Sequence, residues 1–304
     1  MPTFIALASI FVAQLATQVA AGELGDAIQP LVDGHRGKVA VMVKHLKTGE
    51  EFRLAADVPM PTASLIKLAV MIETYQQARE GKMRLEDPVT LTDADKVQGA
   101  GILTTHFSAG ATFPLRDAVR LMIVYSDNTA TNLVLDRIGV GATAERMAAW
   151  GFPNTKIHAK VFRRETSVFP DRSREFGLGS TTAAEMIGLL EELHGGRRIH
   201  EADRAAMLDH LKRCDDKDKF PRFLPAGTVI AHKTGSVDRS RTDAGIIETA
   251  SGPIALCVLT SENEDATWRA DNAGNVLCAK VARAVYDYFN PPNAAKSGKG
   301  DASK

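Results

Sequence analysis

The spacing of apolar residues divides the chain into two strand-rich ends and a helical middle. Five segments carry apolar side chains at three- and four-residue intervals, a spacing that predicts helices; they are Leu115 to Val124, Thr129 to Ile138, Thr143 to Trp150, Thr182 to Leu193 and Glu201 to Lys212. A short amphipathic helix around Leu24 to Val32 comes before them, and a helix from about Asn275 to Phe289 closes the pattern.

Strand-like runs lie towards both ends of the chain. KVAVMVKHL and EFRLA flank a Lys47-Thr48-Gly49 turn, which is typical of a β-hairpin. Three further runs, GTVIAHKTG, RTDAGIIE and PIALCVLTS, follow one another near the other end with turn residues between them. We therefore expect a sheet lobe formed by about residues 22–60 and 214–290 and a helical lobe formed by about residues 61–213. Small-molecule sites usually lie in clefts between such lobes.

Composition narrows the range of partners. The 304 residues include 37 basic and 37 acidic side chains, so no overall field favours nucleic acid or an anionic membrane. The partner expected is a small molecule or a polymer that is met locally, and nothing in the sequence indicates more than a monomer. The eight histidines and three cysteines show no metal-binding spacing, so no metal site is expected. One bridge, between Cys257 and Cys278, is an alternative to buried free thiols, which we favour.

The first 21 residues carry no charged side chain and contain an apolar run from Phe4 to Ala13. This run is too short to span a bilayer and resembles a signal peptide with Val19 and Ala21 before the cleavage point, although the usual basic residue near the start is missing. We therefore expect export to the periplasm or the medium; a poorly ordered N-terminal extension is the alternative. No later run is long enough to span a membrane. The polar tail, residues 291–304, is expected to be disordered.

A lysine interrupts the most apolar helical stretch of the chain. From Leu65 to Ile72 the sequence reads LIKLAVMI, which predicts a helix that is buried on all sides. Burial of an unpaired ammonium group is costly and lowers the pKa of a lysine, so Lys67 is a candidate for chemistry. Ser64 stands one helical turn earlier, where free backbone N–H groups point at any oxyanion that forms. The alternative is that Ser64 only caps the helix and Lys67 extends to the surface.

Two tripeptides complete the pattern. Ser126-Asp127-Asn128 forms a short break between two predicted helices, and Lys233-Thr234-Gly235 ends or lies within a predicted strand. S-x-x-K, S-D-N and K-T-G in this order resemble the signature of class A β-lactamases and penicillin-binding proteins. The resemblance extends to GAGIL at Gly99 and to HKTGSVDRSRTDAG at His232, and it covers most of residues 24–290. It implies a β-lactamase/DD-peptidase-like α/β (α+β) fold, with an antiparallel five-stranded sheet flanked by helices and an all-helical lobe.

The resemblance also implies catalytic roles. Ser64 would attack the carbonyl carbon of the substrate, and Lys67 would take its proton. Ser126 and Lys233 would pass a proton to the leaving nitrogen.

Substrate-binding roles follow from the same resemblance. Asn128 would hold the side-chain amide of the substrate and orient Lys67, while the backbone N–H groups of Ser64 and Ser236 would form an oxyanion hole. The substrate carboxylate would face the strand that carries Lys233, Thr234, Gly235 and Ser236. Arg241 is a further candidate for that carboxylate, with a solvated surface arginine as the alternative.

Removal of the acyl group depends on the segment RRETSVFPDR, Arg163 to Arg172. In class A β-lactamases a glutamate within R-x-E-x-x-L-N positions the hydrolytic water, and Glu165 matches it. Phe169 stands in place of the Asn and offers that water no hydrogen bond. Thr166 replaces a frequent proline, and Gly179 replaces an aspartate that would bind the arginine, for which Asp171 or Glu175 is the substitute expected. The alternative for Glu165 is an exposed carboxylate paired with Arg163 or Arg164.

The function implied is that of an exported serine hydrolase that is acylated on Ser64 and hydrolyses β-lactams, with poor hydrolysis expected where that Asn is missing. A D-alanyl-D-alanine peptidase acting on peptidoglycan stem peptides, a non-catalytic β-lactam or cell-wall sensor and an esterase are the alternatives. None of these mechanisms requires a metal or an organic cofactor.

Overall fold

The computed structural model describes residues 22–291. Its helices are α1 (Glu23–Asp33), α2 (Lys67–Arg79), α3 (Leu103–His106), α4 (Leu115–Val124), α5 (Asn128–Ile138), α6 (Val140–Ala149), α7 (Pro170–Phe176), α8 (Ala183–Gly195), α9 (Glu201–Lys212) and α10 (Ala273–Phe289). Short 3-10 turns are η1 (Ala63–Ile66), η2 (Asp93–Asp95), η3 (Arg164–Thr166) and η4 (Phe220–Phe223). The predicted signal segment and all but the first residue of the predicted tail lie outside the described residues. Within residues 22–291 no helix is both long and apolar enough to cross a bilayer.

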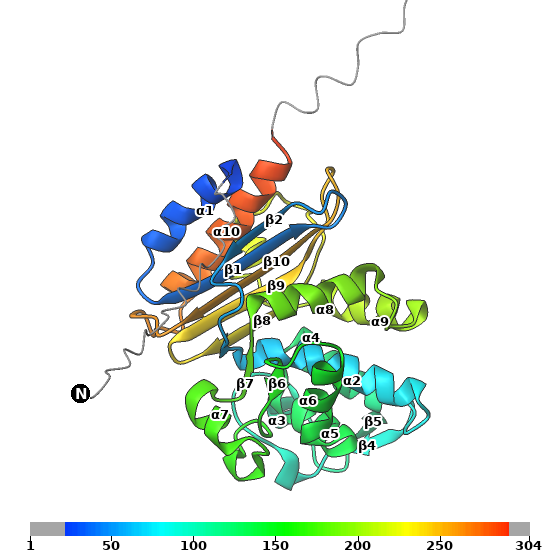
Figure 1. Ribbon diagram of the computed structural model, residues 1–304. Coiled ribbons are helices and arrows are strands. Elements are labelled where there is room, and N and C mark those ends of the chain that lie inside the picture. Colours follow the sequence, from blue (N-terminus) through cyan, green and yellow to red (C-terminus); the bar gives the residue numbers. More distant parts are fainter. Residues whose placement is uncertain (1–21, 292–304) are drawn as a thin grey trace, which may run out of the picture.

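A five-stranded antiparallel sheet joins the two ends of the chain, as predicted. Its strand order is β2-β1-β10-β9-β8, visible in Figure 1 as blue strands beside orange and yellow ones; the strands are β1 (Lys38–His45), β2 (Glu51–Leu54), β8 (Ile230–Val237), β9 (Ser240–Ile247) and β10 (Ile254–Ser261). The sheet ends at β8, so one edge of that strand is free to face a cleft. The other strands are short: β3 (Met60–Pro61), β4 (Pro88–Thr90), β5 (Thr112–Pro114), β6 (Lys156–Ile157) and β7 (Gly179–Thr181).

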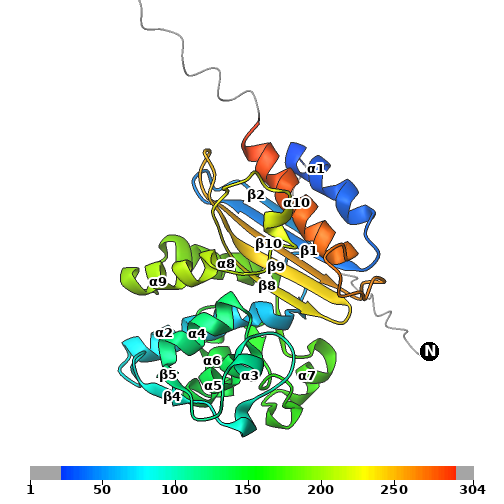
Figure 2. The same cartoon turned by 180° about the vertical axis from the view of Figure 1, so that it is seen from behind.

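Both faces of the sheet are covered. Alternate residues of β10 enter opposite cores: Ala255, Cys257 and Leu259 pack on one side, and Ile254, Leu256 and Val258 on the other. Because side chains alternate across a strand, a strand buried on both faces reads as an unbroken apolar run. Helices α1 and α10 cover one face, while α8 packs on β1 and β10 from the other (Figures 1 and 2). Helix α8 thus contacts the sheet although it lies within the range predicted for the helical lobe.

Helix α2 runs through the interior, as its composition predicted. Every residue from Lys67 to Gln77 is buried, and α4, α5 and α6 pack around it. The three cysteines, Cys214, Cys257 and Cys278, are free and buried, which confirms buried thiols in place of a bridge.

Candidate active site

Ser64 lies on a tight turn at the start of the buried helix. The turn η1 carries it directly into α2, and Ala63 before it adopts a positive φ of 46°. Such a conformation is costly for a residue with a Cβ and persists only where the surroundings hold it. Leu65 N donates to Thr62 O, and Thr242 Oγ1 of β9 donates to the same oxygen at 2.9 Å. The sheet therefore fixes the turn that presents Ser64.

Gly235 allows strand β8 to approach this turn. A Cβ at position 235 would lie 2.3 Å from Thr62 O and 2.9 Å from Leu65 N, both backbone atoms. No side chain fits at these distances without movement of one backbone or the other. The glycine of the K-T-G sequence thus brings the strand and the Ser64 turn together.

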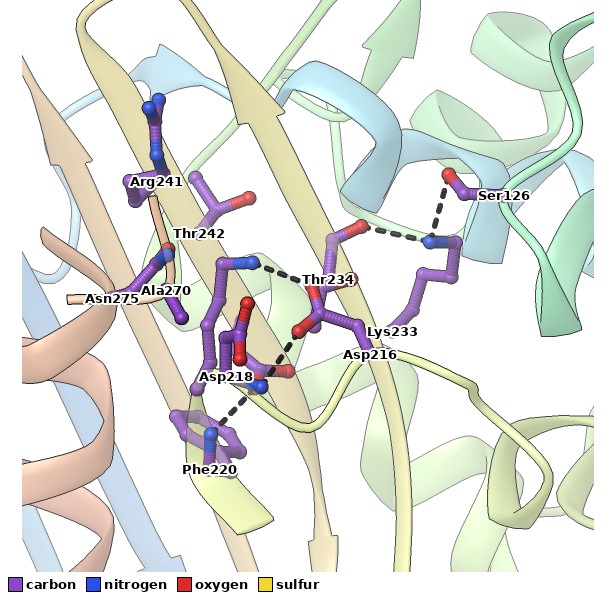
Figure 3. Close-up of polar contacts among 12 residues, drawn as sticks. Ser126, Asp216, Asp218, Phe220, Lys233, Thr234, Arg241, Thr242, Ala270 and Asn275 are labelled. Carbon is purple, nitrogen blue, oxygen red and sulfur yellow. Dashed lines mark hydrogen bonds and ion pairs between the residues drawn. The ribbon is translucent and has the colours of Figure 1, made fainter. Parts of the chain in front are cut away.

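Ser126 connects the two buried lysines. Its hydroxyl accepts a hydrogen bond from Lys233 Nζ at 3.1 Å and lies 3.3 Å from Lys67 Nζ. Figure 3 shows the Lys233 side chain turned towards Ser126 and away from the body of the sheet. Lys67 Nζ also donates to Ser126 O at 2.6 Å and to Asn128 Oδ1 at 2.9 Å. It makes no hydrogen bond to the Ser64 hydroxyl within residues 22–291.

Burial lowers the pKa of both lysines. Desolvation, followed by repulsion from Lys233, places the pKa of Lys67 well below its ordinary value. Desolvation also lowers the pKa of Lys233, against the attraction of nearby anions. Lys67 is fully buried, which excludes the alternative that its side chain extends to the surface. A neutral amine at this position can accept a proton, and Ser126 can relay one between the two nitrogens.

Asp127 and Asn128 hold the loop around Ser126. Asp127 caps α5 by accepting from Ala130 N at 2.8 Å, and its other oxygen accepts from Ile102 N and Leu103 N at 2.7 and 2.8 Å. The Asn128 side chain donates to Gln98 O at 3.0 Å while it orients Lys67. The structural role of Asp127 was not foreseen from the sequence, although its position before a helix is the expected one for a cap.

Two cavities meet at Ser64 and form one cleft. The first, of about 260 Å³, is also lined by Tyr125, Ser126, Cys214, Asp216, Lys233, Thr234, Gly235, Ser236 and Trp268. The second, of about 210 Å³, has more apolar walls, and Asn128, Val161, Phe162, Arg164, Ser236 and Val237 are among the residues that line it. Eight predicted site residues, Ser64, Lys67, Ser126, Asn128, Lys233, Thr234, Gly235 and Ser236, thus line this cleft or contact the side chains that do. Among residues 22–291 no three metal-binding side chains come together.

Arg241 lies outside both cavities. It is buried, and its guanidinium donates to the backbone carbonyls of Asp238 at 3.0 Å, of Ser240 at 2.8 Å and of Thr267. The guanidinium carbon of Arg241 also lies 4.9 Å from the ring centroid of Trp268, which lines the first cavity. The structure therefore gives Arg241 a role in holding the rim of the cleft and not the surface position of the alternative, and Figure 3 shows its side chain directed away from Lys233.

Glu165 also lies outside the cleft. It is exposed in η3, lines neither cavity and forms no ion pair within the described part of the chain, including with Arg163 or Arg164. Arg163 donates to Ala94 O, and Asp171 pairs with Arg174. Thr166 fixes this turn, because its hydroxyl accepts from Lys160 N and donates to Arg163 O. The predicted base thus does not line the cleft that Ser64 lines.

Phe162, and not the predicted Glu165, lies beside Asn128 in the wall of the second cavity. It has a positive φ of 57°, is 59% exposed and lines the second cavity together with Ser64. A Cβ on Gly99 would lie 2.7 Å from Asn128 Nδ2 and 3.2 Å from the Phe162 ring, so the ring and the amide flank the same glycine. Asn132 clamps the preceding residue, Val161, through two hydrogen bonds of 2.7 and 3.0 Å. No sequence signal marked Phe162 or Asn132.

Phe169 lies away from the chemistry. Its ring packs edge-on against His158 with centroids 6.2 Å apart, and Lys156 Nζ lies 5.2 Å from the ring centroid. It lines neither cavity. The peptide between Glu165 and Thr166 is trans, like the others in residues 22–291.

The sheet, the buried lysines and the serine between the two cavities define a serine β-lactamase-like hydrolase. The sequence model of the β-lactamase enzyme family matches residues 23–289, and the chain belongs to that family. A β-lactamase from Streptomyces cellulosae is 27% identical over 264 residues, which are 84% of this chain and 82% of that protein. A β-lactamase structure from Sphaerobacter thermophilus superposes with a TM-score of 0.77 at 28% identity, covering 88% of this chain and 96% of the other. The structure of PBP-A has a TM-score of 0.76 at 24% identity, covers 88% and 95% of the two chains, and shares the fold.

Proposed function

We propose that this chain is acylated by β-lactams on Ser64 and hydrolyses the acyl-enzyme slowly. The observation that carries the proposal is the Ser126 hydroxyl between Lys67 and Lys233, at a cleft that Ser64 lines. Three groups of this kind can move a proton from the attacking hydroxyl to the leaving nitrogen without any further group.

The acylation step uses these groups in sequence. Ser64 Oγ bonds to the β-lactam carbonyl carbon as its proton moves to the neutral amine of Lys67. The C–N bond then breaks while the Ser126 hydroxyl gives its proton to the ring nitrogen and regains one from a lysine. The ammonium group of Lys233, with Thr234 and Ser236, faces the carboxylate that β-lactams carry beside this nitrogen. General acid–base catalysis of this type contributes roughly 10²–10⁴-fold to a rate.

Deacylation lacks an evident base. Glu165 is exposed and outside the cleft, while the Phe162 ring stands beside Asn128. A water molecule poised for attack needs two or more polar partners, and an aromatic ring offers it none. The acyl-enzyme is therefore long-lived, and turnover of β-lactams is slow.

The same observation favours a second candidate, a D-alanyl-D-alanine peptidase. Its peptide substrate also ends in a carboxylate next to the scissile amide, and β-lactams would then act as slow inhibitors. A mutant of PBP-A is described as an acyl-enzyme complex with penicillin G, so the shared fold accommodates such an adduct in that protein.

Labelling and turnover test the proposal together. The protein is mixed with a fluorescent penicillin and, separately, with a chromogenic cephalosporin. We expect stable labelling that is absent in Ser64→Ala, and a burst of about one equivalent followed by slow release. Glu165→Gln is the matched control and should leave both phases unchanged. Rapid steady turnover that disappears in Glu165→Gln would contradict slow deacylation, and an unlabelled Ser64 would contradict the whole proposal. Release of D-alanine from a D-Ala-D-Ala peptide identifies the peptidase.

We also propose export, which the uncharged and apolar residues before position 22 support. Expression of the full chain with fractionation should yield a shortened, periplasmic or secreted product. A full-length product in the cytosol would contradict export.

A further inference from the structure

In the proposed acylation, the two cavities that meet at Ser64 receive different parts of a β-lactam. Ser64 and Ser236 line both cavities, so the reacting carbonyl lies where the cavities join. The first cavity also contains Ser126 and Lys233, which meet the leaving nitrogen and the carboxylate beside it. The acylamino side chain is attached on the other side of the carbonyl and therefore enters the second cavity. The walls of that cavity decide which side chains are accepted.

The second cavity exposes apolar side chains to solvent. Phe162 and Val237 line it and are 59% and 41% exposed, and Val161 and Leu178 add further apolar surface. Large apolar side chains that stay exposed in a cavity beside a nucleophile favour a ligand that removes them from water. The body of the accepted side chain is therefore apolar.

One cation in the wall of this cavity has no partner. Arg164 lines the cavity, is exposed and forms no ion pair within residues 22–291. Lys160 lines it as well, but its ammonium group pairs with Asp136. Among the described residues that line the second cavity there is no carboxylate, and Glu165, which follows Arg164, lines neither cavity. The cavity thus combines apolar walls with one uncompensated positive charge.

We propose that the second cavity selects β-lactams whose side chain has an apolar body and a terminal carboxylate, and that Arg164 is the residue that selects the carboxylate. The proposal rests on the proposed acylation of Ser64. A guanidinium group has the geometry to bind a carboxylate through two parallel hydrogen bonds. Because Arg164 is exposed, the gain is modest, on the order of threefold, and should fall as salt is added.

The test compares two derivatives of benzylpenicillin that carry a carboxylate or a carboxamide at the para position of the ring. The two groups are alike in size and planarity and differ in charge. The second-order rate constant for acylation of Ser64 is measured by mass spectrometry of the intact protein. At low ionic strength the carboxylate compound should react about threefold faster, and the ratio should approach one at about 1 M salt. A wild-type ratio of one at low salt would overturn the proposal.

Variants separate the charge from the apolar wall. Arg164→Gln should bring the ratio to about one and leave the rate for the carboxamide compound unchanged. Arg174→Gln is the matched control, because Arg174 is an exposed arginine of the nearby helix α7 that pairs with Asp171 and lines neither cavity. A ratio that survives Arg164→Gln, or that falls equally in Arg174→Gln, would refute the role of Arg164. Phe162→Ser should slow both compounds by at least about threefold and keep their ratio. Unchanged rates in Phe162→Ser would refute the apolar part.

Equilibrium dialysis of the two compounds against Ser64→Ala measures the same preference without acylation. The carboxylate compound should bind about threefold more tightly, and Arg164→Gln in this background should abolish the difference. If the wild-type protein is never acylated but this difference in affinity is found, the proposed function fails and the selectivity of the cavity stands. If acylation occurs at equal rates and the affinities are equal, the selectivity fails and the proposed function stands.

Discussion

Gly235→Ala should leave the chain folded but slow the acylation of Ser64. The added Cβ would lie 2.3 Å from Thr62 O, whereas ordinary contact begins at 3.4 Å, so strand and turn must separate by about 1 Å. The hydrogen bond from Thr242 Oγ1 to Thr62 O lies in the path of that movement. Overpacking of this kind costs roughly 1–3 kcal/mol of folding free energy. The chain should still fold, since native domains are stable by about 5–15 kcal/mol.

The effect on chemistry should be larger, because the turn that moves carries Ser64. A misplacement of about 1 Å lowers a rate by on the order of 10²-fold. The assay is the rate of Ser64 labelling by fluorescent penicillin in a stopped-flow instrument, together with urea denaturation of the same variant. Gly195→Ala is the matched control, because a Cβ there meets nothing within 4 Å, and it should leave both quantities near wild type. If Gly235→Ala is acylated within about threefold of the wild-type rate, the close approach is not what positions Ser64.

Three further predictions concern the same cleft. Lys67→Arg places a permanent cation beside Ser126 and should slow acylation by at least about 10²-fold. Because burial lowers the pKa of both lysines, the wild-type acylation rate should rise with pH as Lys67 loses its proton and should fall again when Lys233 loses its own. An acylation rate that does not change with pH would contradict this. Asp127→Ala removes the acceptor of three backbone N–H groups, which should cost roughly 3–5 kcal/mol in urea denaturation, and a loss below about 1 kcal/mol would show that water replaces it. Phe162→Glu supplies a carboxylate beside Asn128 and should speed release of the bound penicillin by at least about tenfold. Glu165→Gln should leave the release rate unchanged. Equal release rates in Phe162→Glu and wild type would show that a carboxylate at position 162 does not act as the deacylating base.

Local patterns sufficed for most of the secondary structure. Helix α4 begins and ends where its apolar spacing predicted, and β10 reads as an unbroken apolar run because both of its faces are covered. Helix α8 shows the limit of such patterns. Its apolar face indicates burial, but nothing in the segment states that the partner is the sheet, because that contact joins residues far apart in the chain.

The same limit applies to the residues of the candidate site. Lys67 was visible because a charge inside an apolar helix is a local anomaly, and the structure brings it to Ser126 and Asn128. The position of Glu165 depends instead on contacts that the motif spacing does not include. Asn132 and Thr166 fix the preceding turn and leave this carboxylate exposed, so a match in residue spacing could not give its direction. Arg241 failed to reach the cleft for a similar reason, since the carbonyls that hold it lie on loops whose paths are set by tertiary packing.

The pairing of β1 with β10 has a consequence for biosynthesis. Lys38 is opposite Ser261, so the centre of the sheet closes only after more than two hundred intervening residues have been made. The contacts of the helical segments are shorter in sequence and can form first, since loop closure disfavours distant pairings. Lys233 stands on a strand that joins this late sheet, whereas Ser64 and Ser126 belong to earlier segments. A chain that is still being synthesised, or that is truncated before Lys233, would contain Ser64 but would lack Lys233 in the sheet. Labelling by a penicillin would therefore report that synthesis and folding are complete.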